Sequence, residues 1–132
     1  MTTGESRLRQ ASRLLLAAVM VGAGALHFIS PGTYQPLIPP QLGPPRPWVY
    51  GSGVVEMGAG ALLAVPRTRR LGGWAIALVL LAVWPGNWKM AIDGGYPGAS
   101  GLAGSPVASW IRVPLQIPLI LWALSYTRPK HT

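Results

Sequence analysis

Six polar side chains stand in stretches that are otherwise apolar, and their types point to hydrogen bonding and proton transfer. They are His27, Glu56, Asn87, Lys89, Arg112 and Gln116. A histidine and a carboxylic acid can exchange a proton near neutral pH. Amide and cationic groups can donate hydrogen bonds to a carbonyl or quinone oxygen. We therefore take these six residues as a candidate ligand-binding cluster, with His27 and Glu56 as the candidate acid–base pair.

Glu56 stands in the middle of the apolar stretch YGSGVVEMGAG, residues 50–60. Ser52, Glu56 and Gly60 are spaced four residues apart, so on a helix they lie one above another. A stripe of small residues lets two helices approach closely, and we expect it to face the interior of a helical bundle. Glu56 then points away from lipid.

A carboxylate in such a place either takes up a proton or finds a cation. We expect Arg112 to be the first choice, because a guanidinium stays charged and can bind a carboxylate through two hydrogen bonds. Lys89 is the second choice and His27 the third. Arg112 and Gln116 share one helix face at a spacing of four residues, as do Lys89 and Asp93.

Four long apolar segments are available to position these side chains. Half of the 132 residues are hydrophobic and only 11% are charged, against roughly 25% charged in an average soluble protein. A membrane-spanning helix needs about 20 mostly apolar residues. Leu and Ala outnumber β-branched residues in the segments that qualify, so we expect helices rather than strands. These segments are residues 11–29, 48–65, 71–92 and 107–127.

The sequence thus predicts a single all-α integral membrane domain over residues 1–132, an up-down-up-down bundle of four transmembrane helices. Arginines precede the first segment, fill the PRTRR connection and follow the last segment, whereas the other two connections carry only Arg46. The positive-inside rule then places both termini in the cytoplasm of a multi-pass protein of the cell membrane. A cleaved signal peptide ending near Ala23 or Ala25 is the alternative for the first segment.

In this topology the candidate residues all lie toward the outer side. Glu56 is roughly 12 Å below the outer end of its helix, within a hydrocarbon half-thickness of about 15 Å. The inner halves, such as LLLAAV and GALLAV, contain nothing ionisable. Pro85, Pro114 and Pro118 are expected to kink the last two helices, which either frees carbonyl groups beside the cluster or only shapes the packing.

The two outer connections differ in composition. Residues 30–47 contain seven prolines interleaved with Tyr and aliphatic residues. We expect a folded cap there, with a flexible Pro-rich tether as the alternative. The segment GGYPGASGLAGSP, residues 94–106, is rich in glycine and serine, and we expect it to be mobile.

Composition also excludes several kinds of chemistry. The net charge of +8 fits nucleic-acid binding or a membrane protein, but no basic face alternates with aromatic residues, so no nucleic-acid partner is expected. The absence of cysteine excludes disulfides, thiolate metal sites and iron–sulfur clusters. His131 lies in the C-terminal tail, which leaves His27 and carboxylates as too few ligands for a metal site.

Three stretches together resemble the DoxX-like family of small bacterial membrane proteins over about residues 23–126. The stretches are GALHFISPGTYQPLIPPQL, VYGSGVVEMGAGALLAVPRTRRLGGWAIALVLLAVWPGNWKMA and WIRVPLQIPLILWA. The matching features are His27 within LHF, Pro39–Pro40, Gly53 with Glu56, the PRTRR turn, Asn87 with Met90, and Arg112 to Gln116 in RVPLQ. The resemblance implies a four-helix membrane bundle.

The same resemblance implies a redox partnership by analogy. Some relatives are subunits of quinone-linked sulfur or terminal oxidases, and others accompany methylamine dehydrogenase maturation or membrane redox-defence complexes. We therefore expect a non-catalytic subunit or accessory of a membrane redox complex, with a polar site for a quinone or lipid-like molecule near the outer leaflet and no intrinsic cofactor. Expected partners are the bilayer, other subunits and further copies of the chain.

Two alternatives remain open. The first is a structural membrane scaffold without a ligand, in which the polar side chains only hold helices together. The second is a small lipid-modifying enzyme that uses His27 and Glu56 as acid and base.

Overall fold

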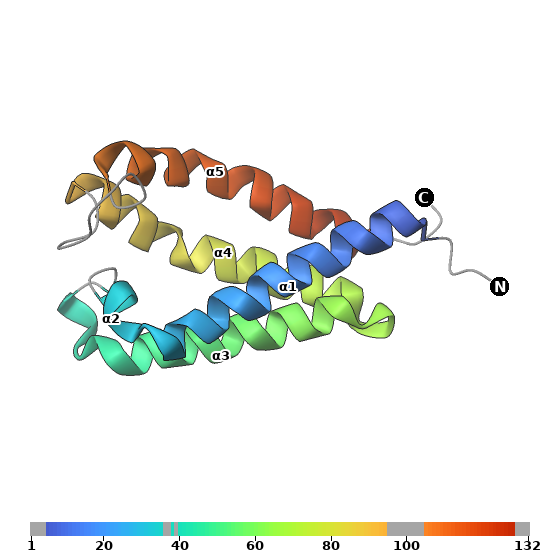
Figure 1. Ribbon diagram of the computed structural model, residues 1–132, viewed down its shortest axis with the longest axis horizontal. Coiled ribbons are helices and arrows are strands. Elements are labelled where there is room, and N and C mark those ends of the chain that lie inside the picture. The colour runs from blue at the N-terminus through green and yellow to red at the C-terminus, as the bar shows by residue number, and fades with distance from the viewer. Residues whose placement is uncertain (1–4, 36–37, 39, 95–104, 129–132) are drawn as a thin grey trace.

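The computed structural model describes residues 5–35, 38, 40–94 and 105–128, and this part of the chain is helical and contains no strand. The expected all-α class is confirmed. The four long helices are α1 (Arg7–Ile29), α3 (Pro45–Ala64), α4 (Arg69–Ile92) and α5 (Pro106–Leu124) (Figure 1). They are accompanied by short helical turns between α1 and α3, between α3 and α4, and after α5; these are α2 (Pro31–Tyr34), η2 (Pro40–Leu42), η3 (Pro66–Thr68) and η5 (Ser125–Thr127).

The helices begin slightly earlier than the apolar segments suggest, for reasons that lie at their first turns. α1 starts at Arg7, because the hydroxyl of Ser6 accepts a hydrogen bond from the backbone N–H of Arg9 at 3.0 Å and caps the helix. α3 starts at Pro45, since a proline in the first turn gives up no helical hydrogen bond. The predicted mobility of residues 94–106 concerns a segment that lies almost entirely outside the described residues.

The helices pair in chain order. α1 packs against α3, α4 packs against α5, and α3 joins the two pairs by packing against α4. In Figure 1 the two pairs lie close together at the end where the chain begins and ends, and they diverge toward the end that carries α2. The two ends of the bundle therefore differ, and we call them the basic end, where α1 begins and α5 ends, and the α2 end.

Glycines set how closely the helices approach. A Cβ on Gly53 would lie 2.8 Å from the carbonyl oxygen of Gly24 on α1, and one on Gly73 would lie 2.7 Å from the carbonyl oxygen of Ala123 on α5. At Gly72 a Cβ would collide with the backbone of Leu63. Each of the three helix interfaces therefore depends on backbone-to-backbone contact, as in small-residue packing between membrane helices.

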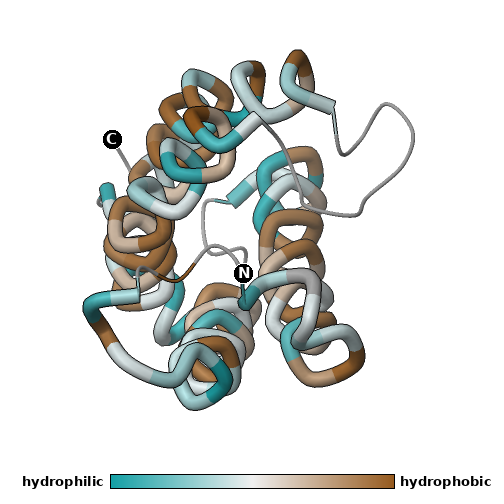
Figure 2. Tube along the Cα trace, turned by 90° about the vertical axis from the view of Figure 1, so that its left-hand side faces the viewer, coloured by the Kyte–Doolittle hydropathy of each residue, from teal (hydrophilic) through white to brown (hydrophobic). Residues whose placement is uncertain are grey.

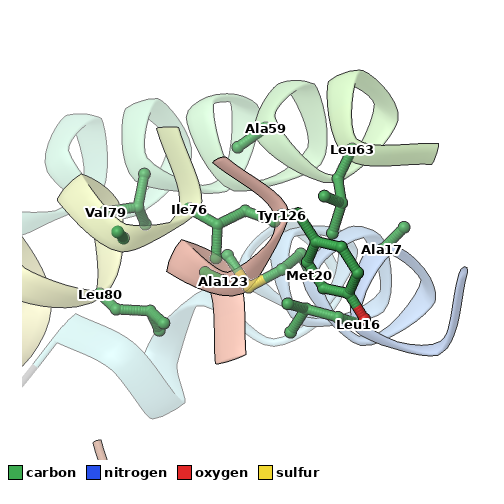
Figure 3. Packing of buried hydrophobic residues seen from close by; sticks show 11 residues of the cluster. Leu16, Ala17, Met20, Ala59, Leu63, Ile76, Val79, Leu80, Ala123 and Tyr126 are labelled. Atoms are coloured by element: carbon green, nitrogen blue, oxygen red, sulfur yellow. The ribbon is translucent and has the colours of Figure 1, made fainter. Parts of the chain in front are cut away.

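The apolar core lies toward the basic end. It combines Leu16 and Met20 of α1 with Leu63 of α3, Ile76 of α4 and Tyr126 of η5, so every long segment contributes (Figure 3). The hydroxyl of Tyr126 lies 2.6 Å from the hydroxyl of Ser12, which provides its hydrogen-bond partner inside this core. The candidate polar residues consequently lie outside the main core, nearer the α2 end.

Three of the long helical segments are long and apolar enough to cross a membrane: Arg7–Ile29, Pro66–Ile92 and Pro106–Thr127. α3 is not among them, because its glycines, Ser52 and Glu56 lower its mean hydropathy. Large apolar side chains are exposed on all four long helices, among them Leu15, Val54, Leu78 and Leu121. Figure 2 shows hydrophobic residues, in brown, at many positions around the long helices. Exposed apolar side chains of this kind are compatible with a membrane location.

Candidate functional site

His27 and Glu56 form a close side-chain pair between α1 and α3. Nε2 of His27 lies 3.1 Å from Oε2 of Glu56, and each residue is only 7% exposed. The close approach of Gly24 and Gly53, one turn before each partner, brings the two helices near enough for these side chains to meet. The pair is therefore a product of the glycine contact between α1 and α3.

The second ring nitrogen of His27 fixes where the protons are. Nδ1 lies 2.7 Å from the backbone carbonyl oxygen of Ala23. A carbonyl oxygen can only accept, so Nδ1 carries a hydrogen and donates it. A short contact between Nε2 and the carboxylate then requires one shared proton, held either as imidazolium beside carboxylate or as neutral imidazole beside carboxylic acid. The pair is electrically neutral in both arrangements and can gain or lose one proton.

Glu56 keeps hydrogen-bonding capacity beyond its histidine partner. The hydroxyl of Ser52 donates weakly to the same oxygen, Oε2, at 3.5 Å. No described residue donates to the other oxygen, Oε1, whereas every fully enclosed side-chain nitrogen or oxygen of the described residues has a partner. Oε1 therefore retains some accessible surface, and a hydroxyl or water could reach it.

The α2 end covers this pair with aromatic rings. The ring of Tyr34, in α2, stacks on His27 with centroids 4.0 Å apart, and Phe28 stacks on Tyr50 at 5.1 Å. The indole N–H of Trp48 donates to the carbonyl oxygen of Leu42 at 3.0 Å and ties η2 to α3. The described part of the predicted cap is thus folded, while residues 36, 37 and 39 lie outside the described residues.

A second polar group lies between α4 and α5. Gln116, 6% exposed, donates from Nε2 to the carbonyl oxygen of Leu80 at 3.1 Å and accepts from Nδ2 of Asn87 at 3.3 Å. The indole N–H of Trp84 donates to the carbonyl oxygen of Val113 at 2.8 Å. Leu80 and Val113 are each one residue before a carbonyl that a proline leaves without its helical donor, namely Leu81 for Pro85 and Pro114 for Pro118.

The expected order of partners for Glu56 was wrong, because the partner in the structure is His27 and not Arg112. Arg112 is half-buried, and its Nη1 contacts Sδ of Met90 at 3.9 Å. Lys89 pairs with Asp93 on the exposed face of α4 at 2.7 Å. The six candidate residues therefore fall into two groups, one between α1 and α3 and one on α4 and α5. Helical spacing indicates which face a residue occupies, but it does not indicate which neighbouring helix covers that face.

Sequence analysis missed a buried arginine. Arg13 is 1% exposed, and its Nη1 donates to the carbonyl oxygens of Leu63 and Ala64 at 2.8 and 2.7 Å. Its Nε and Nη2 bind the two carboxylate oxygens of Glu5 at 2.9 and 3.1 Å. The positive-inside rule treats such an arginine only as a cytoplasmic charge. The available signal was the spacing of Glu5, Arg9 and Arg13 at four-residue intervals.

Other arginines at the basic end also bind helix C-termini. Arg9 donates from Nη2 to the carbonyl oxygen of Ser125 at 2.6 Å, and Arg70 donates from Nε to that of Thr127 at 2.9 Å. A helix C-terminus carries partial negative charge and leaves carbonyls without helical partners. The Arg13 guanidinium likewise holds the pKa of the Glu5 carboxyl below its usual value, mainly through its hydrogen bond. The basic residues at this end therefore stabilise the fold as well as carrying charge.

Among the described residues, no cluster of three or more His, Asp or Glu side chains could hold a metal ion. The chemistry that the described groups support is hydrogen bonding and single-proton transfer at His27 and Glu56.

Comparison with known proteins finds one matching family. The sequence model of a domain of unknown function, DUF8561, matches residues 16–127. No curated protein matches the chain, and no solved structure matches it. The resemblance to DoxX-like proteins remains a prediction.

Proposed function

The chain belongs to the family defined by DUF8561, a domain of unknown function. We propose that it is an integral membrane protein with a binding site for a quinone or lipid-like molecule. Its four long helices span the bilayer, and both termini are cytoplasmic. The chain acts as a subunit or accessory of a membrane redox complex. The observation that carries the binding site is the buried pair of His27 and Glu56, whose nitrogen and oxygen are 3.1 Å apart.

Packing supports a spanning role for α3, the one long helix that is not among the three candidate membrane spans. Its 20 residues reach about 30 Å, the thickness of the hydrocarbon core. Gly53 contacts α1 near the middle of α3, and Leu63 contacts Gly72 of α4 near its C-terminal end. A helix held along its length between two spanning helices crosses the membrane with them, and its one carboxylate then faces its neighbour α1 rather than lipid.

The distribution of arginines supports the orientation. Arg7, Arg9 and Arg13 begin α1, Arg67, Arg69 and Arg70 lie at the α3–α4 connection, and Arg128 follows η5. Cytoplasmic loops are enriched in such residues. Because the chain has no cysteine, single-cysteine variants Gln41→Cys and Arg67→Cys test the orientation directly. A membrane-impermeant maleimide should label the first in intact cells and the second only after permeabilisation; the reverse pattern would invert the topology.

The geometry of the pair suits a ligand with a carbonyl or hydroxyl headgroup. A quinone oxygen accepts hydrogen bonds and a quinol hydroxyl donates them. The two forms differ by two electrons and two protons; the pair can supply or take up one of these protons, while the electrons come from the partner redox complex. Oε1 of Glu56 offers an additional acceptor. The stacked ring of Tyr34 provides an aromatic wall beside His27. The redox partnership itself is supported by the DoxX-like resemblance.

A second candidate function is a membrane scaffold without a small-molecule ligand. The specific observation in its favour is that every fully enclosed side-chain nitrogen or oxygen of the described residues already has a protein partner. Glycine-mediated contacts at three helix interfaces also favour a scaffold, because they produce a tightly packed bundle.

Co-purification separates these possibilities. The protein is purified in mild detergent, its small molecules are extracted into organic solvent and identified by mass spectrometry, and associated proteins are identified in parallel. We expect a quinone or lipid at about one molecule per chain, retained in Asp93→Asn and depleted in Glu56→Gln. The Asp93 variant is a matched control, since it removes an exposed carboxylate at the same end of the bundle.

Two other outcomes would replace the proposed function. A stable protein partner, with no small molecule above the lipid background, would favour the scaffold. Turnover of a membrane lipid that disappears in Glu56→Gln would favour a lipid-modifying enzyme with His27 and Glu56 as acid and base.

A further inference from the structure

The basic end of the bundle carries a large excess of positive charge. The chain has only three acidic side chains. Glu56 and Asp93 lie toward the α2 end, and Glu5 is already bound to Arg13. The charges of Arg9 and Arg69 also act on Glu5 and help to lower its pKa, but one carboxylate cannot neutralise the remaining arginines of this end, which are Arg7, Arg9, Arg67, Arg69, Arg70 and Arg128.

Three of these arginines lie on segments of the basic end: Arg67 in η3, Arg70 in the first turn of α4 and Arg128 directly after η5. The hydrogen bond from Arg70 to the carbonyl oxygen of Thr127, at 2.9 Å, brings α4 beside Arg128. Arg67 lies three residues before Arg70 on the same connection. Arg67 and Arg128 are exposed, and neither makes a hydrogen bond or ion pair with any described residue. Their guanidinium groups are therefore available to an external anion.

An exposed apolar stripe leads away from these cations. Arg70, Trp74 and Leu78 follow at four-residue spacing on one face of α4, and Trp74 and Leu78 are 53% and 62% exposed. The order is cation, tryptophan and aliphatic side chain. A phospholipid presents the complementary order of phosphate, interfacial region and acyl chain.

From this juxtaposition we propose that an anionic phospholipid binds the α4 face at the basic end. Its phosphate lies against Arg67, Arg70 and Arg128, and its acyl chains run along Trp74 and Leu78. Guanidinium groups bind phosphate oxygens through paired charge-assisted hydrogen bonds. The apolar stripe favours a lipid over a nucleic acid or free phosphate, neither of which has acyl chains to cover it. The inference rests on the proposed membrane embedding and is independent of the ligand at His27 and Glu56.

Lipid titration followed by native mass spectrometry tests the inference on the detergent-solubilised full chain. The probes are phosphatidylglycerol and, as the uncharged-headgroup comparison, phosphatidylcholine of the same acyl composition. The test variant is Arg67→Gln with Arg128→Gln, which removes two cations that hold no structural contact. The control is Arg46→Gln with Lys89→Gln, which removes two cations from the α2 end. A conservative double variant, Arg67→Lys with Arg128→Lys, keeps both positive charges.

We expect the wild-type chain to bind phosphatidylglycerol about tenfold more tightly than phosphatidylcholine. The test variant should lose most of this preference, whereas the control and the lysine variant should keep it. Equal binding of the two lipids, or equal losses in the test and control variants, would overturn the inference. So would displacement by millimolar inorganic phosphate, which would indicate a simple anion site, or tighter binding of a short RNA.

The failures of the two proposals are distinguishable. If the chain is extracted from membranes by alkaline carbonate, the membrane embedding itself fails. If it stays embedded and binds a quinone but shows no lipid preference, only the lipid inference fails.

Discussion

Nε2 of His27 and Oε2 of Glu56 lie 3.1 Å apart across the interface between α1 and α3. With Nδ1 bound to the carbonyl oxygen of Ala23, the pair shares one proton and carries no net charge. A neutral pair is the form in which an acid and a base are least costly inside a membrane. The same pairing leaves one oxygen of the Glu56 carboxyl group without a donor among the described residues.

Removal of the carboxylate should destabilise the fold. In Glu56→Ala the buried Nε2 of His27 loses its partner, and the free energy of unfolding should fall by about 1–3 kcal/mol. Thermal unfolding in detergent provides the measurement. Asp93→Ala is the control, because its exposed pair with Lys89 should contribute no more than about 1 kcal/mol. Equal losses in both variants would contradict the buried pairing.

Arg13 should matter more than any other arginine for stability. Arg13→Met removes the donor to the carbonyls of Leu63 and Ala64 and the guanidinium that binds Glu5, and breaking a buried ion pair from one side costs about 3–5 kcal/mol. Arg13→Lys should lose less, since it keeps the charge but not the forked geometry. The exposed Arg7→Met should stay within about 0.5 kcal/mol. Chemical unfolding in detergent compares the three variants, and a Met variant as stable as Arg7→Met would refute the role of Arg13.

The pair of Glu5 and Arg13 should make stability depend on pH in one direction. The guanidinium lowers the pKa of Glu5 in the folded state, so the stabilisation is fully present above the unfolded-state pKa and is lost as pH falls through the folded-state value. The difference in melting temperature between wild type and Glu5→Gln should therefore shrink from about pH 7 to about pH 3. A difference that stays constant over this range would show that the pair makes no such contribution.

Gly53 should be intolerant of a side chain. Its Cβ would lie 2.8 Å from the carbonyl oxygen of Gly24 and from Cβ of His27, so Gly53→Ala should push α1 from α3 and cost about 1–3 kcal/mol. Gly58 is a matched control on the same helix, with nothing within 4 Å of its Cβ position. Gly58→Ala should be neutral or stabilising by up to about 1 kcal/mol, because alanine favours helix. Measured melting temperatures in the opposite order would contradict this packing.

Apolar segment length predicted the four long helices well. The expected segments 11–29, 48–65, 71–92 and 107–127 fall inside or within a few residues of the helices Arg7–Ile29, Pro45–Ala64, Arg69–Ile92 and Pro106–Leu124. Boundaries differ because capping by Ser6 and prolines in a first turn extend a helix into polar sequence. Such local effects are not visible in hydropathy.

The site was harder to predict, because helical spacing does not identify neighbours. The spacing of Ser52, Glu56 and Gly60 indicated a shared inward face, but not that α1 covers it. That choice depends on Gly24 meeting Gly53, and a pairing of two glycines far apart in the sequence has no local signal. Arg13 was missed for a related reason, since its acceptors are the end of α3 and Glu5.

The central claim is that the pair of His27 and Glu56 binds the headgroup of a quinone-like molecule. Its most direct test is a titration of the protein in lipid nanodiscs with a short-chain quinol, whose hydroxyl can donate to Oε1 of Glu56, followed by tryptophan fluorescence. We predict saturable binding in wild type and Asp93→Asn, weakened roughly tenfold or more in Glu56→Gln, because the amide cannot share a proton with His27 and the acceptor for the quinol is lost or misplaced. Binding of equal strength in all three proteins, or no saturable binding in wild type, would contradict the claim.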